Sequence, residues 1–255
     1  MIYNIYGKVY IGGDIMKFVQ AQFSLKYEPQ IRIRRSANLI EDCLQDYYNA
    51  PQVLPVPDDI APEAPRIVLA SKNGHSSINF SQLSVDFISN FDGEYLENYE
   101  KTKTYIKERI EWLKQLLNQI GITDYYFWGI TYNIHLDIGD SNPLDYIRKL
   151  LGDSVLATAK LYEVMQRITS VEADRYFVNR QISTFKEYQS KGITNPTLLD
   201  FSNSKLISEG VNLSLDVNNR YAFLRSGKVS VMDNFDDELN KIFKLIEKNF
   251  SEFEG

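Results

Sequence analysis

The sequence predicts an α+β fold of two tandem β-α-β(3–4)-α repeats, with antiparallel sheets and long helices packed on one face. The first observation is a repeated layout: residues 71–94 and 216–238 each contain an Asn turn, two short β-like runs and an Asn-Phe-Asp-x-Glu motif. The second is apolar residues at helical spacing over 94–120 and 236–253. The third is alternation of apolar and polar residues over 17–27 and 126–138, which is typical of half-buried strands.

Composition limits the class of protein. A chain of 255 residues with 44% hydrophobic and 24% charged residues fits one large globular domain or two smaller ones that share a core. The net charge of −6 argues against a protein whose main task is to bind a phosphate backbone. One cysteine rules out an intrachain disulfide or a cysteine-rich zinc site. With no membrane-length apolar run and no signal-peptide pattern, we expect a cytoplasmic protein without a membrane partner.

The first repeat is predicted to span 17–121, after an N-terminal strand or extension over 1–16. Its first strand, 17–27, is followed by a helix with Asn38 as N-cap. Residues 51–65 hold five of the eight prolines, so they should form an extended arm. A strand over 66–71, a hairpin turn at Asn73-Gly74, one bent or two short strands over 76–89 and a helix over 94–120 complete the repeat.

The second repeat is predicted to span 122–255. It begins with the strand over 126–138 and a short helix over 143–151. A hairpin over 159–170 and 175–185 is followed by an irregular stretch over 188–209. The strand over 211–217 should turn at Asn218-Asn219, a run over 221–232 should complete the sheet, and a helix over 236–253 should end the repeat.

Several of these features resemble a sporadically distributed, uncharacterised bacterial family. They are Val56-Pro57-Asp58-Asp59 leading to Pro65-Arg66 and a Ser-x-Asn-Gly turn, the strand over 126–138, Val211 to Asp216 with Asn218-Asn219-Arg220, and an acidic C-terminal helix ending in Phe. The resemblance covers the chain from Lys17 on and implies no activity or site residue. The order of elements also resembles the TATA-box-binding-protein-like and helix-grip architectures, a likeness of topology that implies no function.

Catalytic signatures are missing from the sequence. It has no phosphate-binding Gly-rich loop, no dinucleotide fingerprint, no His-Glu-x-x-His and no Gly-x-Ser-x-Gly motif. Asp137, Asp140 and Asn142 lack the spacing of a calcium loop, so a turn before a helix is the better interpretation. The run with Arg32, Arg34 and Arg35 could pair with phosphate or simply be a solvated strand end. The sequence therefore predicts no catalytic residue, no metal ligand and no cofactor, and it favours a protein that is not an enzyme.

The faces of the strands that point away from the core carry uncharged amides and hydroxyls instead of the usual Lys and Glu. Such a face is expected when something polar and neutral covers it: the other half of the chain, a second subunit, a ligand or a peptide. The alternative is an ordinary solvated sheet of unusual composition. His135 is the one proton carrier there. The candidate binding residues are Gln20, Gln22, Thr131, Asn133, His135, Asn179, Gln181, Asn212 and Ser214, and Asp216 belongs to the same predicted face.

These observations lead to one hypothesis and two alternatives. The hypothesis is a cytoplasmic, non-enzymatic interaction protein that uses this face and the proline arm to bind another protein or a second copy of itself. The first alternative is a small-ligand receptor or enzyme with a pocket lined by the same face. The second is a saddle that binds nucleic acid, which the acidic charge and the few Lys and Arg on the face disfavour.

Overall fold

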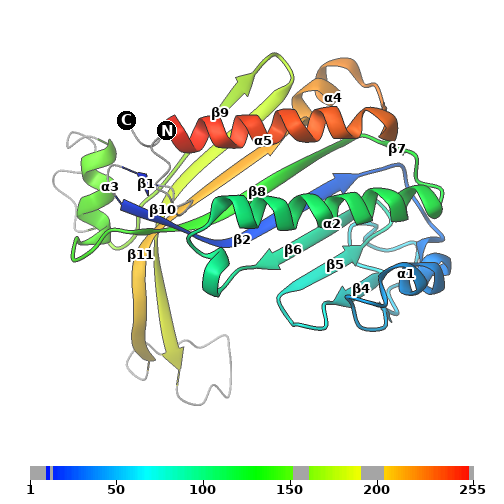
Figure 1. Cartoon of the computed structure of the whole chain (residues 1–255), viewed down its shortest axis with the longest axis horizontal. Coiled ribbons are helices and arrows are strands. Elements are labelled where there is room, and N and C mark those ends of the chain that lie inside the picture. The colour runs from blue at the N-terminus through cyan, green and yellow to red at the C-terminus, as the bar shows by residue number, and fades with distance from the viewer. Residues whose placement is uncertain (1–9, 12–13, 152–160, 191–203, 253–255) are drawn as a thin grey trace.

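The computed structural model describes residues 10–11, 14–151, 161–190 and 204–252 (Figure 1). It is a mixed α+β fold with one large antiparallel sheet and, in the described part, five α-helices. Most of the predicted N-terminal extension, the start of the predicted hairpin at 159–160 and the last predicted helical residue, 253, lie outside the described residues. No described helix combines the length and apolar character that crossing a membrane requires.

The N-terminal part contributes six strands and two helices. Its strands have side chains that alternate between buried and less buried positions, as one-sided packing requires. Asn98 caps the long helix by accepting a hydrogen bond from the backbone N–H of Lys101 at 3.1 Å. In chain order these elements are β1 (Tyr10–Ile11), β2 (Asp14–Lys26), α1 (Ala37–Leu44), β3 (Gln52–Val53), β4 (Ile67–Ala70), β5 (Ser76–Phe80), β6 (Ser84–Asn90) and α2 (Tyr99–Gln119).

The C-terminal part contributes the remaining strands and three helices. In chain order they are β7 (Asp124–Tyr125), β8 (Phe127–Asp137), α3 (Pro143–Leu151), β9 (Met165–Glu172), β10 (Tyr176–Ser190), β11 (Ser204–Asn218), α4 (Arg220–Ser226), β12 (Ser230–Val231) and α5 (Phe235–Glu252). The predicted helices at 143–151 and 236–253 are confirmed to within a residue.

Both parts of the chain build the same sheet. Its strand order is β3-β4-β5-β6-β2-β8-β11-β10-β9, with β1 beside β2 off this path, while β7 and β12 form a separate small pair. The junction is the antiparallel pairing of β2 with β8, in which Gln20 lies opposite Asn133 and Phe23 opposite Ile130. The sequence left open whether the two halves lie side by side or face to face, and this pairing places them side by side.

The core lies between one face of this sheet and the helices α2 and α5, which run across it (Figure 1). Aromatic rings join the layers: Phe18 on β2 lies 5.6 Å from both Tyr99 on α2 and Phe250 on α5. Trp128 on β8 lies 4.6 Å from Phe235 at the start of α5 and 5.8 Å from Phe23. All of these side chains are buried, so the two halves of the chain share one hydrophobic core.

The two stretches that suggested a repeated layout have different structures. Residues after Asn73-Gly74 form strand β5, whereas residues after Asn218-Asn219 form helix α4. The predicted turn back into the sheet over 221–232 is therefore wrong. Asn219 explains the difference. Its buried side chain accepts a hydrogen bond from the backbone N–H of Trp128 at 2.8 Å. This bond holds the chain against β8 at the point where helix α4 begins.

Three further predicted boundaries are corrected by the structure. Helix α1 begins at Ala37 after a 3-10 turn, so Asn38 is not its N-cap. Residues 94–98 precede helix α2, because the cap at Asn98 starts the helix only at Tyr99. The stretch predicted to be irregular at 188–209 is extended where it is described, since β10 continues to Ser190 and β11 starts at Ser204.

The prediction of an extended arm over 51–65 is only partly correct: Gln52–Val53 is the edge strand β3, whereas residues 58–64 lie mostly in turns. Two arginines hold the segment in place. Arg66 is fully buried and donates hydrogen bonds to the carbonyls of Ala64, Pro57 and Ile60. Arg34 pairs with Asp58 and also donates to the carbonyls of Leu54 and Val56. Arg34 therefore binds the proline-rich segment and is not a free phosphate ligand.

Candidate functional site

The strand register places all nine candidate binding residues on one face of the sheet. Directly opposite residues in antiparallel strands point to the same side. The register pairs Gln20 with Asn133, Gln22 with Thr131, Asn212 with His135, Ser214 with both Asn133 and Gln181, and Asp216 with both Thr131 and Asn179. We call this surface the polar face; it comprises Gln20, Gln22, Thr131, Asn133, His135, Asn179, Gln181, Asn212, Ser214 and Asp216, all of them half-buried.

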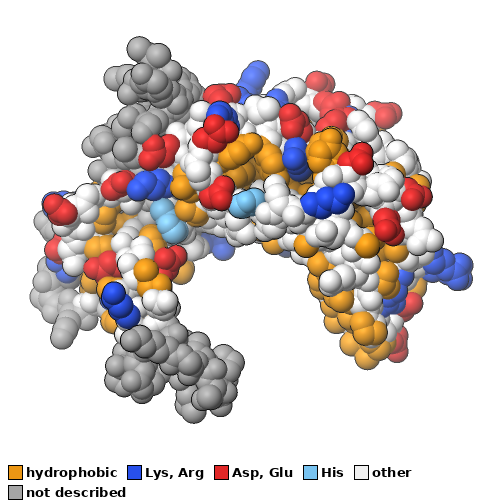
Figure 2. Space-filling model, turned by 60° about the horizontal axis from the view of Figure 1, so that its bottom comes forward, with side chains coloured by type: hydrophobic (Ala, Val, Ile, Leu, Met, Phe, Trp, Pro, Cys, Tyr) orange, Lys and Arg blue, Asp and Glu red, His pale blue; other side chains and the backbone are white. Residues whose placement is uncertain are grey.

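The polar face lies on the side of the sheet that helices α2 and α5 leave uncovered. Seen from below, the molecule is hollowed between the projecting end of β10 and β11 and the lobe that contains α1, β4 and β5 (Figures 1 and 2). White, uncharged side chains and backbone make up most of the roof of this hollow in Figure 2. The face is thus concave and largely uncharged.

Cross-strand hydrogen bonds connect part of the polar face. Asn133 donates from Nδ2 to Oε1 of Gln20 at 2.9 Å, and Gln20 in turn donates to Asn90 at 2.9 Å. A second row centres on Asp216, whose carboxylate accepts from Asn179 at 2.7 Å and from Thr131 at 3.3 Å. These bonds fix the rotamers of the side chains that make them.

Other members of the polar face have no such partner. The side chains of Gln22, Gln181, Asn212 and Ser214 form no hydrogen bond to any described residue. Half-buried amides with open donors and acceptors cost free energy unless water or a partner satisfies them. The hydrogen-bonding capacity of the polar face is therefore partly unused.

Asp216 is the carboxylate at the centre of the polar face. Burial raises its pKa above the usual range, although hydrogen bonds from Asn179, Asn218 and Thr131 act in the opposite direction. The same three donors favour an ionised acceptor at neutral pH. Asp216 therefore organises the amides around it, and its oxygens are already occupied by protein donors.

His135 lies against an aromatic ring that the sequence analysis did not include in the site. The imidazole stacks on Phe185 with ring centroids 4.1 Å apart and planes 20° from parallel. Phe185 in turn covers Gly210, where an added Cβ would come within 2.8 Å of the ring and would require the ring to shift. Phe185 continues the alternation of Asn179, Gln181 and Ser183, and this spacing is the signal by which it could have been found.

The environment of His135 predicts a pH-dependent contribution to stability. Burial lowers the pKa of His135 below its usual 6.5, and nearby Lys17 lowers it further, while Glu187 raises it. The unfolded chain therefore binds this proton more readily than the folded chain. The stabilisation is complete above about pH 6.5 and is lost as the pH falls toward the lower pKa of the folded state.

We expect the free energy of unfolding to fall less between about pH 7 and about pH 5.5 in His135→Gln than in the unmodified protein. Urea titrations at both pH values measure this difference. His75→Gln, at a histidine on the β4–β5 turn, is the matched control. Equal pH dependence in the unmodified protein and His135→Gln would contradict the assignment.

Both lysines at the border of the polar face lie close to a carboxylate. Lys17 pairs with Asp137 at 2.8 Å, and Lys26 lies 3.9 Å from Asp86. Arg167, on the edge strand β9, donates to Asn179 at 3.3 Å.

No protein-family model and no curated protein matches the sequence. The chemistry of the polar face must therefore be interpreted from its own residues.

The end of β8 and the loop between β8 and α3 contain the acidic residues that a metal site would require. No group of three or more His, Cys, Asp or Glu side chains within the described ranges is arranged to hold a metal ion. Asn142 caps the following helix, accepting from the backbone N–H of Leu144 at 3.0 Å, as expected for a turn before a helix. Asp137 pairs with Lys17 at 2.8 Å.

Proposed function

We propose that the chain is a non-enzymatic, cytoplasmic interaction protein whose polar face binds a partner protein. The observation that carries this proposal is the set of half-buried amides and hydroxyls on the concave side of the sheet that have no hydrogen-bond partner among the described residues. These groups are neutral and offer both donors and acceptors. A polypeptide, whose backbone and polar side chains present the same two kinds of group, is complementary to such a surface.

Nucleic acid is a weaker candidate for this surface. Binding to a phosphate backbone requires cations that are free to replace condensed counterions. Lys17 and Lys26, the lysines at the border of the polar face, are both close to carboxylates, and Asp216 adds a negative charge at its centre. The net charge of −6 acts in the same direction.

We also propose that 17–121 and 122–255 are tandem β-α-β(3–4)-α repeats. The support is the order of elements: β2, α1, the strands β3 to β6 and α2 are followed by β8, α3, the strands β9 to β11 and α5. In each set the first strand pairs with the last one, β2 with β6 and β8 with β11. The two first strands meet at the centre of the sheet, which makes the polar face a surface shared by both repeats.

The proposal predicts that added charge on the polar face removes a bound protein. The test variant combines Gln22→Lys, Gln181→Lys and Asn212→Lys, because these side chains make no hydrogen bond that folding would lose. We expect native mass spectrometry of the gently purified protein to show a co-purifying protein. The triple variant should bind this protein about tenfold more weakly, which corresponds to about 1.4 kcal/mol of binding free energy.

The matched control adds the same charge elsewhere. Thr104→Lys, Asn118→Lys and Thr123→Lys lie on α2 and just after it, at exposed positions away from the polar face. This control should retain the partner. Equal retention by both variants, equal loss from both, or a purified protein without any partner would contradict the proposal.

A further inference from the structure

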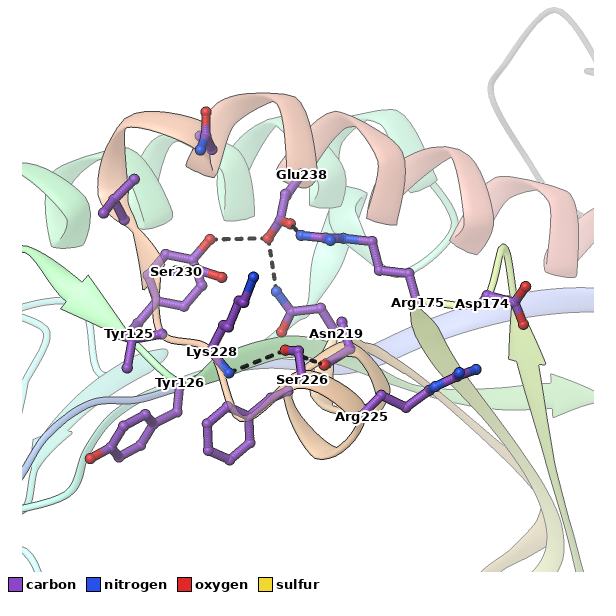
Figure 3. A pocket seen from close by; sticks show the side chains of 15 residues that line it. Tyr125, Tyr126, Asp174, Arg175, Asn219, Arg225, Ser226, Lys228, Ser230 and Glu238 are labelled. Carbon is purple, nitrogen blue, oxygen red and sulfur yellow. Dashed lines mark hydrogen bonds and ion pairs between the residues drawn. The ribbon is translucent and has the colours of Figure 1, made fainter.

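A second candidate site lies away from the polar face. It is a pocket of about 510 Å³ where four segments meet: the strand β7, the turn between β9 and β10, helix α4 with the loop after it, and the first turn of α5 (Figure 3). This volume is within the range of roughly 300–1,000 Å³ that small-molecule sites occupy. None of the candidate residues from the sequence analysis lines it.

The base of the pocket is a buried carboxylate. Glu238, on the first turn of α5, has a side chain only 5% exposed and pairs with Arg175 from the β9–β10 turn. Its Oε2 also accepts from the hydroxyl of Tyr125 at 3.0 Å and from Nδ2 of Asn219 at 2.8 Å. Three donors from three different segments hold this group, so the base of the pocket is preformed and its negative charge is compensated (Figure 3).

Two exposed cations line the pocket, and one of them, Arg225, also lies over the ring of Tyr221 at 5.8 Å. Arg225 and Lys228 are exposed, and neither forms an ion pair with any residue that the structure describes. Lys228 extends toward the space between Tyr125 and Asn219 in Figure 3. With Arg175, these cations outnumber the two acidic lining residues, Asp174 and Glu238, in a chain whose net charge is −6. The pocket is locally basic in an acidic protein.

The pocket also has an aromatic wall. The rings of Tyr126 and Phe223 lie 5.1 Å apart and are tilted by 35°, and both line the cavity. Ala222 and Val229 add apolar surface beside them. A flat unsaturated group is the natural partner of such a wall, because ring faces and edges gain both burial and favourable quadrupole contacts.

We propose that this pocket binds a small organic anion with a planar apolar body. The carboxylate or phosphate of the ligand pairs with Lys228, and its planar body packs on Tyr126 and Phe223. Glu238 does not attract a cation into the base of the pocket, since Arg175, Tyr125 and Asn219 already occupy its oxygens. The site is independent of the proposed partner binding at the polar face.

Four benzene derivatives of similar size test the charge preference on the whole protein. The probes are phenyl phosphate, benzoate, the neutral benzyl alcohol and the cationic benzylammonium, titrated by NMR in low salt. We expect phenyl phosphate and benzoate to bind at least about tenfold more tightly than benzylammonium, the ratio that one additional favourable ion contact of about 1.4 kcal/mol gives. Added salt should weaken the binding of both anions. Binding of none of the four probes, or equal binding of all four, would overturn the proposal.

Variants connect this preference to the pocket. Lys228→Met keeps the length of the side chain and removes its charge, and we expect it to weaken phenyl phosphate binding about fivefold to tenfold. Lys244→Met, at an exposed position on α5 outside the pocket, is the control and should bind like the unmodified protein. Phe223→Leu should weaken all the probes that bind, whatever their charge. If Lys228→Met and Lys244→Met bind equally well, the anion lies elsewhere and the assignment is wrong.

Discussion

Replacing Trp128 with alanine is expected to lower the free energy of unfolding by about 3–5 kcal/mol, the usual loss for a large aromatic side chain in a well-packed core. Trp128 is fully buried on β8, next to the junction between the two halves of the sheet. Its ring contacts Phe23 on β2 and Phe235 on α5. The indole therefore joins a strand from each half to the C-terminal helix, and surrounding elements cannot all close around the cavity it leaves.

Urea titration followed by circular dichroism measures the effect of Trp128→Ala without relying on tryptophan fluorescence. We expect a single transition at lower urea, since a shared core should unfold as one unit. Trp112→Ala is the matched control: Trp112 is half-buried, stacks on Tyr47 at 4.2 Å and lies outside the junction, so its loss should cost less. Two separate transitions, only one of which moves to lower urea in Trp128→Ala, would show that the halves unfold independently.

The sequence predicted the polar face well because alternation is a local signal. A strand with one face in the core must place every second residue on that face, and a slip of one residue would bury the polar set. Residues such as Asn133 and Ser214 are therefore assigned correctly from their own strands alone. Phe185 shows the limit of this reasoning, since an aromatic residue on a polar face runs against the pattern that identifies the face.

Long-range contacts explain what the sequence could not predict. Asn218-Asn219 resembled a hairpin turn, but the buried hydrogen bonds of Asn219 with Trp128 and Glu238 direct the chain into helix α4 instead. Glu238 followed the pattern of an acidic residue at a helix start, which the helix dipole favours. Its role at the base of the pocket depends on Arg175 and Tyr125, which lie far away in sequence. No local pattern encodes such a meeting of segments.

Replacing Arg66 with methionine is expected to destabilise the protein by about 3–5 kcal/mol, because each hydrogen bond made by a charged group contributes about 1.5–3 kcal/mol. The guanidinium is fully buried and donates to three carbonyls of the proline-rich segment: Ala64 at 2.9 Å, Pro57 at 3.0 Å and Ile60 at 2.7 Å. Methionine fills a similar length but donates no hydrogen bond. The three carbonyls then lose the donor that ties the segment to the sheet.

This loss should be local before it is global, because the proline-rich segment contains the edge strand β3 and lies far from the centre of the sheet. We therefore expect limited proteolysis to cut Arg66→Met faster than the unmodified protein between residues 51 and 65, under conditions where α2 and α5 stay intact. Arg35→Met is the matched control, since Arg35 is exposed and should change stability by less than about 0.5 kcal/mol. If Arg66→Met is as stable and as resistant as Arg35→Met, the carbonyls of this segment do not depend on the guanidinium.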